Sequence, residues 1–135
     1  MTLDKILSIS GKPGLYKLVT QTRTGFVGES LLDGKRITVG LRNNVSVLSE
    51  IAIYTLEEEV PLREVFLNIQ VKEKGGETSV SHKEDKLKLE EYFFEVLPNY
   101  DEDRVYASDI KKIIRWYNLL REKGITDFSD SNEEE

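Results

Sequence analysis

Residues 25–40 read GFVGESLLDGKRITVG, and this stretch decides the fold of the first part of the chain. Its two halves are short runs rich in β-branched, aromatic and aliphatic residues, which favour strands. Asp33-Gly34 stands between them, and Asp-Gly is typical of a hairpin turn because glycine adopts positive φ without steric cost. Gly25 and Gly28 inside the first run indicate a bulge or a tight bend. The stretch therefore predicts two antiparallel strands joined by a turn.

Further strands are predicted on both sides of this hairpin. Upstream, GLYKLVTQT at residues 14–22 reads as a strand and is followed by the turn-like spacer Arg23-Thr24-Gly25. Downstream, Asn43-Asn44 marks another turn before VSVLSEIAIYT. Residues 14–56 thus hold four or five short strands, and such a sheet must curl into a small barrel or be covered by helices. The preceding TLDKILSI, residues 2–9, predicts a short helix or turn.

Helical periodicity begins after the strands. A first helix starts at Pro61 and repeats apolar residues with a helical period until Gly75-Gly76. A second helix starts at residues 81–84, SHKE, which match the S-x-x-E capping box, and stops before Pro98. The polar segment between these two helices, residues 75–81, has the composition of a linker.

A third helix, SDIKKIIRWYNLLR at residues 108–121, is capped by Ser108 and ends at Gly124. At 100° per residue its apolar arc comprises Ile110, Ile113, Ile114, Tyr117 and Leu120, with Lys111, Lys112 and Arg115 opposite. Trp116 lies at the border, and Leu119 is a misfit on the charged side. This layout favours a core helix with a solvated basic face over a helix that recognises a phosphate backbone, which normally carries short polar residues near its N-terminus.

Composition limits the classes of function. The 135 residues carry a net charge of −6, no cysteine and a single histidine. The absence of cysteine excludes disulfides and thiolate nucleophiles and is consistent with a reducing cytoplasm. The sequence has neither an apolar run long enough to cross a bilayer nor a signal peptide, so we expect a cytoplasmic protein with no membrane association.

Motifs for catalysis or cofactor binding are weak. His82 lies next to a predicted helix cap, where a catalytic role is not indicated. The acidic run beginning at Asp101 lacks the glycine and glutamate of a calcium loop. Gly11 to Gly14, GKPG, lacks the spacing of a phosphate-binding loop. We therefore expect no catalytic residue, no cofactor and no metal ion.

Charge is distributed unevenly, which leaves binding as the best hypothesis. Residues 1–56 carry seven basic and four acidic side chains, and residues 108–123 carry five and two, a balance of +3 in each segment. The residues of the candidate binding surface are Tyr16, Lys17, Arg23, Phe26, Lys35, Arg36, Arg42, Lys111, Lys112, Arg115 and Trp116. A non-enzymatic adaptor for a protein partner is the first hypothesis, because the chain is acidic overall. An RNA- or DNA-binding module is the alternative, and an enzyme comes third.

Three stretches also carry a resemblance. They read LDKILSISGKPGLYKLVTQTRTGFVGESLLDGKRITVG, NNVSVLSEIAIYT and EEYFFEVLPNYDEDRVYASDIKKIIRWYNLL. Together, over residues 3–121, they resemble a family of small proteins from Bacteroidota-type bacteria that is classed as a domain of unknown function. The resemblance implies an SH3- or Tudor-like front half, and it implies no catalytic or binding residue.

We accordingly predict an α+β protein in which a small, strongly bent antiparallel β-barrel precedes a helical unit. The predicted divisions are a barrel with its closing helix at 1–74, a linker at 75–81, a helical unit at 82–123 and an acidic disordered tail at 124–135.

Overall fold

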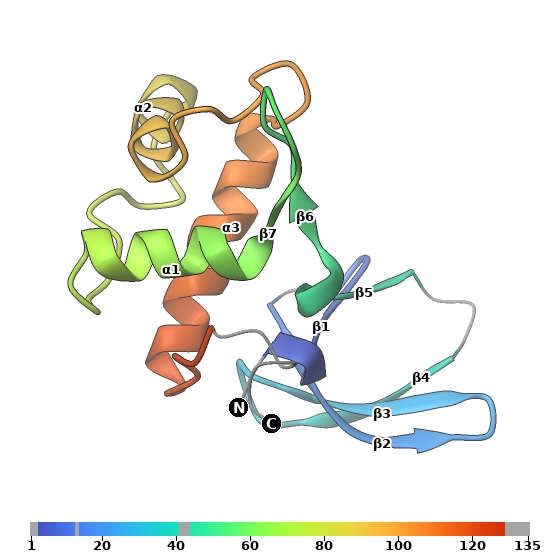
Figure 1. Cartoon of the computed structure of the whole chain (residues 1–135). Helices are drawn as coiled ribbons and strands as arrows, with labels where there is room; N and C mark the ends of the chain where they lie inside the picture. The colour runs from blue at the N-terminus through green and yellow to red at the C-terminus, as the bar shows by residue number, and fades with distance from the viewer. Residues whose placement is uncertain (1–2, 13, 41–43, 129–135) are drawn as a thin grey trace.

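The computed structural model describes residues 3–12, 14–40 and 44–128. Hairpins build a five-stranded antiparallel sheet with the order β4-β3-β2-β1-β5 (Figure 1). Its strands are β1 (Ile6–Ile9), β2 (Tyr16–Thr22), β3 (Gly25–Ser30), β4 (Arg36–Gly40) and β5 (Val45–Val47). β5 returns across the sheet to pair with β1, so the chain does not form a simple meander.

The predicted hairpin at Asp33-Gly34 is confirmed. Gly34 has a φ of +75°, and the Asp33 carboxylate accepts a hydrogen bond of 2.9 Å from the Lys35 backbone N–H. The bend predicted near Gly28 is present as a register shift in β2, between Leu18 and Thr20, directly opposite Gly28. Both features follow from local turn and glycine chemistry, which a short sequence window contains.

The start of the chain differs from its prediction. Residues Leu3–Lys5 form a short 3-10 helix, η1, but Ile6–Ile9 form β1, an interior strand of the sheet, and are not part of a helix or turn. Four residues are too few to show a period, so only the pairing of β1 with β2 and β5 identifies it as a strand.

A short connection leads from the sheet to the helices. It contains a 3-10 helix, η2 (Leu48–Glu50), and a two-stranded ladder of β6 (Ala52–Ile53) and β7 (Val60–Pro61). Three helices follow: α1 (Leu62–Lys72), α2 (Lys86–Val96) and α3 (Ala107–Glu122). In Figure 1 the helices lie on one side of the molecule, the five-stranded sheet on the other, and β6 and β7 between them.

Two of the predicted helix starts are wrong. The N-cap of α2 is Asp85, four residues after the expected cap Ser81, because the Asp85 carboxylate accepts the Lys88 backbone N–H at 3.0 Å. Ser81 instead closes a turn with Lys83. α3 has its N-cap at Tyr106 rather than at Ser108, and the Asp109 carboxylate accepts the Tyr106 N–H at 3.0 Å. The predicted ends hold, since Gly124 has a φ of +76°.

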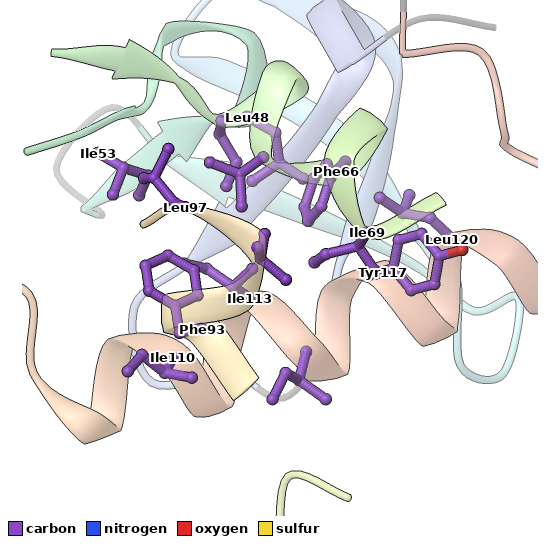
Figure 2. Packing of buried hydrophobic residues seen from close by; sticks show 14 of the residues in the cluster. Leu48, Ile53, Phe66, Ile69, Phe93, Leu97, Ile110, Ile113, Tyr117 and Leu120 are labelled. Carbon is purple, nitrogen blue, oxygen red and sulfur yellow. The ribbon is translucent and has the colours of Figure 1, made fainter. Parts of the chain in front are cut away.

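One hydrophobic core joins the sheet to the helices. Leu3, Ile6, Leu15 and Leu48 belong to the same buried cluster as the inner faces of α1, α2 and α3. Figure 2 shows Leu48 and Ile53 beside Phe66, Phe93 and Ile113. A second, smaller cluster of Leu7, Ile9, Tyr16 and Val39 fills the other face of the sheet.

The α+β class is confirmed, whereas closure into a barrel is not. Among the described residues no ladder joins the edge strands β4 and β5. α1, which the sequence places with the sheet, packs instead with α2 and α3 as well as with η2 and β7. In the described part of the chain, no helix is long and apolar enough to cross a membrane.

The segment 75–81 lies against α3. The Tyr117 hydroxyl donates to the Gly76 carbonyl at 3.0 Å, and the Thr78 N–H donates to the Asn118 side chain at 3.1 Å. Residues 125–128, which the sequence places in a disordered tail, instead pack on the helices. Phe128 is 1% exposed, and its ring lies 5.3 Å from that of Phe66. A single aromatic residue among acids carries no periodic signal, so sequence patterns do not reveal this contact.

Candidate binding site

A cavity of about 270 Å³ lies between the β1–β2 turn and α3. We call it the basic cavity. The sheet side contributes Ser8, Ile9, Ser10, Gly11, Lys12, Gly14 and Leu32, and α3 contributes Lys112, Arg115, Trp116 and Leu119. No residue of the wall is an Asp or a Glu within the part of the chain that is described.

Strand alternation and glycine geometry build the sheet wall. In β1, Ile6 and Ser8 point to the helical side, while Leu7 and Ile9 point into the second core. The β1–β2 turn then places Lys12 at the cavity, with the Lys12 N–H donating to the Ile9 carbonyl at 3.0 Å. Gly14 has a φ of +71°, and a Cβ there would lie 2.7 Å from Leu32 Cδ1. Glycine therefore allows Leu32 to lie directly against the turn.

The helix wall is a second stripe on α3. Lys112, Arg115, Trp116 and Leu119 stand at i, i+3, i+4 and i+7, so they share one side of the helix. The predicted buried arc is confirmed beside it, since Ile110, Ile113, Ile114, Tyr117 and Leu120 are all buried. Leu119, the misfit of the sequence pattern, is explained by this second stripe, which faces the sheet.

Among the described residues, the cations of the basic cavity have no acidic partner. Many basic side chains elsewhere are paired, such as Lys72 with Glu95 at 2.7 Å and Arg104 with Asp101 at 2.8 Å. By contrast, no hydrogen bond or ion pair of the Lys12, Lys112 or Arg115 side chains is found over the described residues. Arg115 also acts on His82: burial first, and then the charges of Arg115, Lys83 and Lys111, lower the pKa of this imidazole.

A second cavity of about 220 Å³ adjoins the first along α3. We call it the apolar cavity, since Ile51, Ile53, Leu62, Val105 and Ile113 contribute to its wall. Lys112 and Trp116 line both cavities. Arg104 also reaches the apolar cavity, but its guanidinium is held 4.4 Å above the Tyr54 ring and bonded to Asp101.

The structure brings together three of the residues predicted for a binding surface, which are Lys112, Arg115 and Trp116. Lys111 is exposed but is not among the residues that line either cavity. Tyr16 is buried in the second core, and Phe26, which is partly buried, packs against it.

The basic residues of the sheet lie elsewhere. Arg36 pairs with Glu29 at 3.7 Å, and Lys17 stands opposite the same glutamate in the β2–β3 ladder. Arg23 lies in the β2–β3 turn, at the end of the sheet away from α3 (Figure 1), and Lys35 follows the β3–β4 turn. Arg42 is outside the described residues. Lys12 was missed, because only the tertiary fold brings its turn to α3.

Within the ranges that the structure describes, no group of three or more His, Asp or Glu side chains is placed to hold a metal ion. The Asp101 carboxylate accepts the Asp103 N–H at 3.0 Å and the Arg104 guanidinium, so it is used in a local turn.

These features define a class: an α+β protein whose sheet and third helix enclose a cationic cavity. A family model, Domain of unknown function (DUF6852), matches residues 51–120, and the chain belongs to this family. A second model, Domain of unknown function (DUF5606), matches residues 3–48. A solution NMR structure of a structural genomics target from Bacteroides vulgatus is 46% identical, with a TM-score of 0.78 over 98% of this chain and 95% of that one. A search of curated proteins gave no significant match.

The resemblance read from the sequence is thereby confirmed. Both family models describe domains of unknown function, and the similar solved structure comes from a member of the Bacteroidota.

Proposed function

We propose that this protein is a non-enzymatic cytoplasmic adaptor that binds an anionic group of a protein partner in the basic cavity. One observation carries the proposal: Lys12, Lys112 and Arg115 converge on a cavity whose described wall holds no acid, in a chain with a net charge of −6. The anionic group is a carboxylate or a phosphoryl group, because both accept hydrogen bonds from lysine and arginine.

Electrostatics supports a ligand at this site. Lys112 and Arg115 are three residues apart on α3, and like charges at that spacing destabilise a helix by roughly 0.2–0.5 kcal/mol. Lys12 adds a third positive charge from the sheet. A bound anion relieves this repulsion, and the arginine contributes a planar, bidentate donor.

The surroundings favour a compact anionic group over a long polyanion. A neighbouring hollow that shares Leu32, Arg115 and Leu119 with the basic cavity is also lined by Glu77 and Glu122. Asp109 lies on the opposite side, in the wall of the apolar cavity. A nucleic-acid strand that follows α3 meets negative charge in both directions, whereas one side-chain carboxylate or phosphate does not.

Nucleic acid is the second candidate, because a tryptophan beside unpaired cations is a suitable surface on which to stack a base.

We also propose that the five-stranded sheet is an SH3-like barrel. The return of β5 to pair with β1 supports it, since this strand order is the one expected when a small bent sheet begins to close on itself.

Trp116 provides the test, because it is the only tryptophan and lines the cavity. Its fluorescence is followed during titration with an acetylated peptide containing two glutamates, a phosphoserine analogue, a glutamine control and a 20-nucleotide single strand of RNA or DNA. We expect saturable binding of the acidic peptides only, and about tenfold weaker binding by Lys112→Gln and Arg115→Gln.

Lys111→Gln is the matched control. It removes the same charge from the neighbouring position of α3, but Lys111 does not line the cavity. Equal losses for Lys111→Gln and Lys112→Gln indicate a diffuse charge effect and contradict the proposal. Tighter binding of the oligonucleotide than of either peptide supports the nucleic-acid candidate instead.

His82 offers a second readout, because it is the only histidine and its pKa is lowered first by burial and then by the charge of Arg115. An anion bound at Arg115 offsets that positive charge, so we expect the His82 pKa to rise when the acidic peptide saturates the protein. The imidazole resonance in an NMR pH titration measures the change. An unchanged His82 pKa at saturation places the bound anion away from Arg115.

A further inference from the structure

One edge of β6 carries backbone N–H and C=O groups for which no hydrogen bond is assigned within the described residues. The Leu62 N–H donates to the Ile51 carbonyl at 2.9 Å, and Ala52 stands opposite Pro61 in the β6–β7 ladder. In an antiparallel pair the residues that bond to the partner strand alternate with those that do not. The backbone carbonyl groups of Ile51 and Ile53 therefore point towards β7, whereas the backbone N–H and C=O of Ala52 point away from it.

This outer edge already accepts one strand-like contact. The Asp101 N–H donates to the Tyr54 carbonyl at 2.9 Å, on the side away from β7. Ala52, two residues earlier, is exposed, and within the described chain its outward N–H and C=O have no assigned backbone partner. One donor and one acceptor are thus left side by side on a strand edge, an arrangement that accepts an added strand.

The free edge borders the apolar cavity. Four consecutive residues, Ile51 to Tyr54, line it, together with Ile113 and Trp116 from α3. The basic cavity begins at the other side of Lys112 and Trp116, one turn further along the helix. One helical turn is ~5.4 Å long, and a strand rises ~3.3 Å per residue, so one or two strand residues span the step between the cavities.

We propose that the anionic group arrives on an extended protein segment that pairs with the edge of β6 at Ala52. An apolar side chain of the segment fills the apolar cavity, and an acidic or phosphorylated residue one or two positions away enters the basic cavity. This inference rests on the proposed function and specifies its partner. The N–H and C=O of Ala52 match the C=O and N–H of one residue in an antiparallel strand, which favours a peptide backbone as the partner.

Three acetylated five-residue peptides serve as probes, with glutamate and leucine one, two or three positions apart on a threonine background. A fourth peptide has threonine in place of leucine. Trp116 fluorescence measures binding, and we expect the best spaced peptide to bind at least tenfold more tightly than the peptide without leucine. A single N-methyl group should reduce affinity about tenfold at the one peptide position that pairs with Ala52, and less than twofold at the other positions.

Ala52→Pro removes the outward N–H without touching a β6–β7 hydrogen bond, and Ile51, with φ −80° and ψ 135°, already has the backbone that precedes proline. We expect at least tenfold weaker binding, against less than twofold for the control Ala52→Val. Both variants are first compared with the parent by circular dichroism and melting temperature. If Ala52→Pro does not fold, the N-methyl series on the unmodified protein decides.

The outcomes separate the two proposals. Binding of the glutamate peptide that neither leucine nor N-methylation alters overturns the strand-pairing inference and leaves the proposed function standing. Absence of binding by all four peptides overturns both. An N-methyl effect confined to one peptide position, together with peptide binding that Lys112→Gln does not weaken, supports the edge but contradicts the anionic group.

Discussion

Gly25 and Gly40 face each other across the β3–β4 ladder, but only one of them has room for a side chain. A Cβ on Gly25 would lie 1.9 Å from the backbone oxygen of Val39, whereas a Cβ on Gly40 meets nothing within 4 Å. We expect Gly25→Ala to lower the free energy of unfolding by about 1–3 kcal/mol or more, because the strand backbones must move apart. Urea denaturation measures the change.

Gly40→Ala is the control at the paired position, and we expect it to alter stability by less than about 0.5 kcal/mol. Similar effects of the two substitutions would mean that β3 and β4 are not this close at Gly25.

His82 gives the protein a pH dependence with a definite sign. Burial and the cations Arg115, Lys83 and Lys111 lower its pKa in the folded protein below the usual 6.5. Glu77 and Glu122, which line the same hollow, do not reverse this direction. As the pH falls through 6.5 the unfolded chain takes up the proton first, so the free energy of unfolding decreases until the folded pKa is passed.

Well above pH 6.5, His82 is neutral in both the folded and the unfolded protein, so it has no effect on how the free energy of unfolding depends on pH. We therefore expect His82→Gln to lose less stability than the parent protein between pH 7.5 and pH 5. Urea denaturation at several pH values gives the comparison, and a steeper loss in the variant would contradict the direction of the shift.

At the scale of elements, α3 combines two stripes with different tasks. One is buried against α1 and α2, and the other faces the sheet across the basic cavity. Ile113 is 2% exposed, so Ile113→Ala should cost roughly 2–5 kcal/mol of stability. Lys111 is exposed, and Lys111→Ala should cost under about 0.5 kcal/mol. Guanidinium denaturation tests both, and equal small losses would show that the faces are assigned wrongly.

Sequence patterns predict these elements to the extent that the decisive contacts are local. The Asp33-Gly34 turn, the buried arc of α3 and the stop at Gly124 depend on neighbouring residues, and all three are present. The start of α2 is mispredicted because Ser81 and Asp85 are both good capping residues, and only the geometry selects Asp85.

The candidate site likewise contains some residues that local sequence patterns predict and others that only the tertiary fold brings together. Helical spacing alone places Lys112, Arg115 and Trp116 close together. Lys12 and Ala52 come from turns and strands far away in the chain, and no spacing rule connects them with α3. The stripe i, i+3, i+4, i+7 that includes Leu119 was the available signal, since a leucine among cations indicates a second covered face.

For the whole molecule, the last described residues act as part of the core. Phe128 is 1% exposed and packs near Phe66 and Tyr117. We expect Phe128→Ala to cost about 3–5 kcal/mol, as for other buried phenylalanines. Phe94, which is 54% exposed on α2, is the control, and Phe94→Ala should cost far less. Thermal unfolding distinguishes the two variants. A small loss of stability for Phe128→Ala would show that Phe128 belongs to the tail and not to the core.

The two family models meet at residues 48–51, where η2 leads from the sheet to β6. Leu48 is fully buried there, in the cluster that also contains Phe66 and Ile113. A gene interrupted at this point would yield two polypeptides that share one interior, with Leu3, Ile6, Leu15 and Leu48 on the first and the rest of the cluster on the second. Neither polypeptide alone can cover its part of this shared cluster, so the two should be poorly soluble apart and should reassociate when produced in the same cell. The position suits a split reporter, in which recovery of the fold signals that two fused proteins have met.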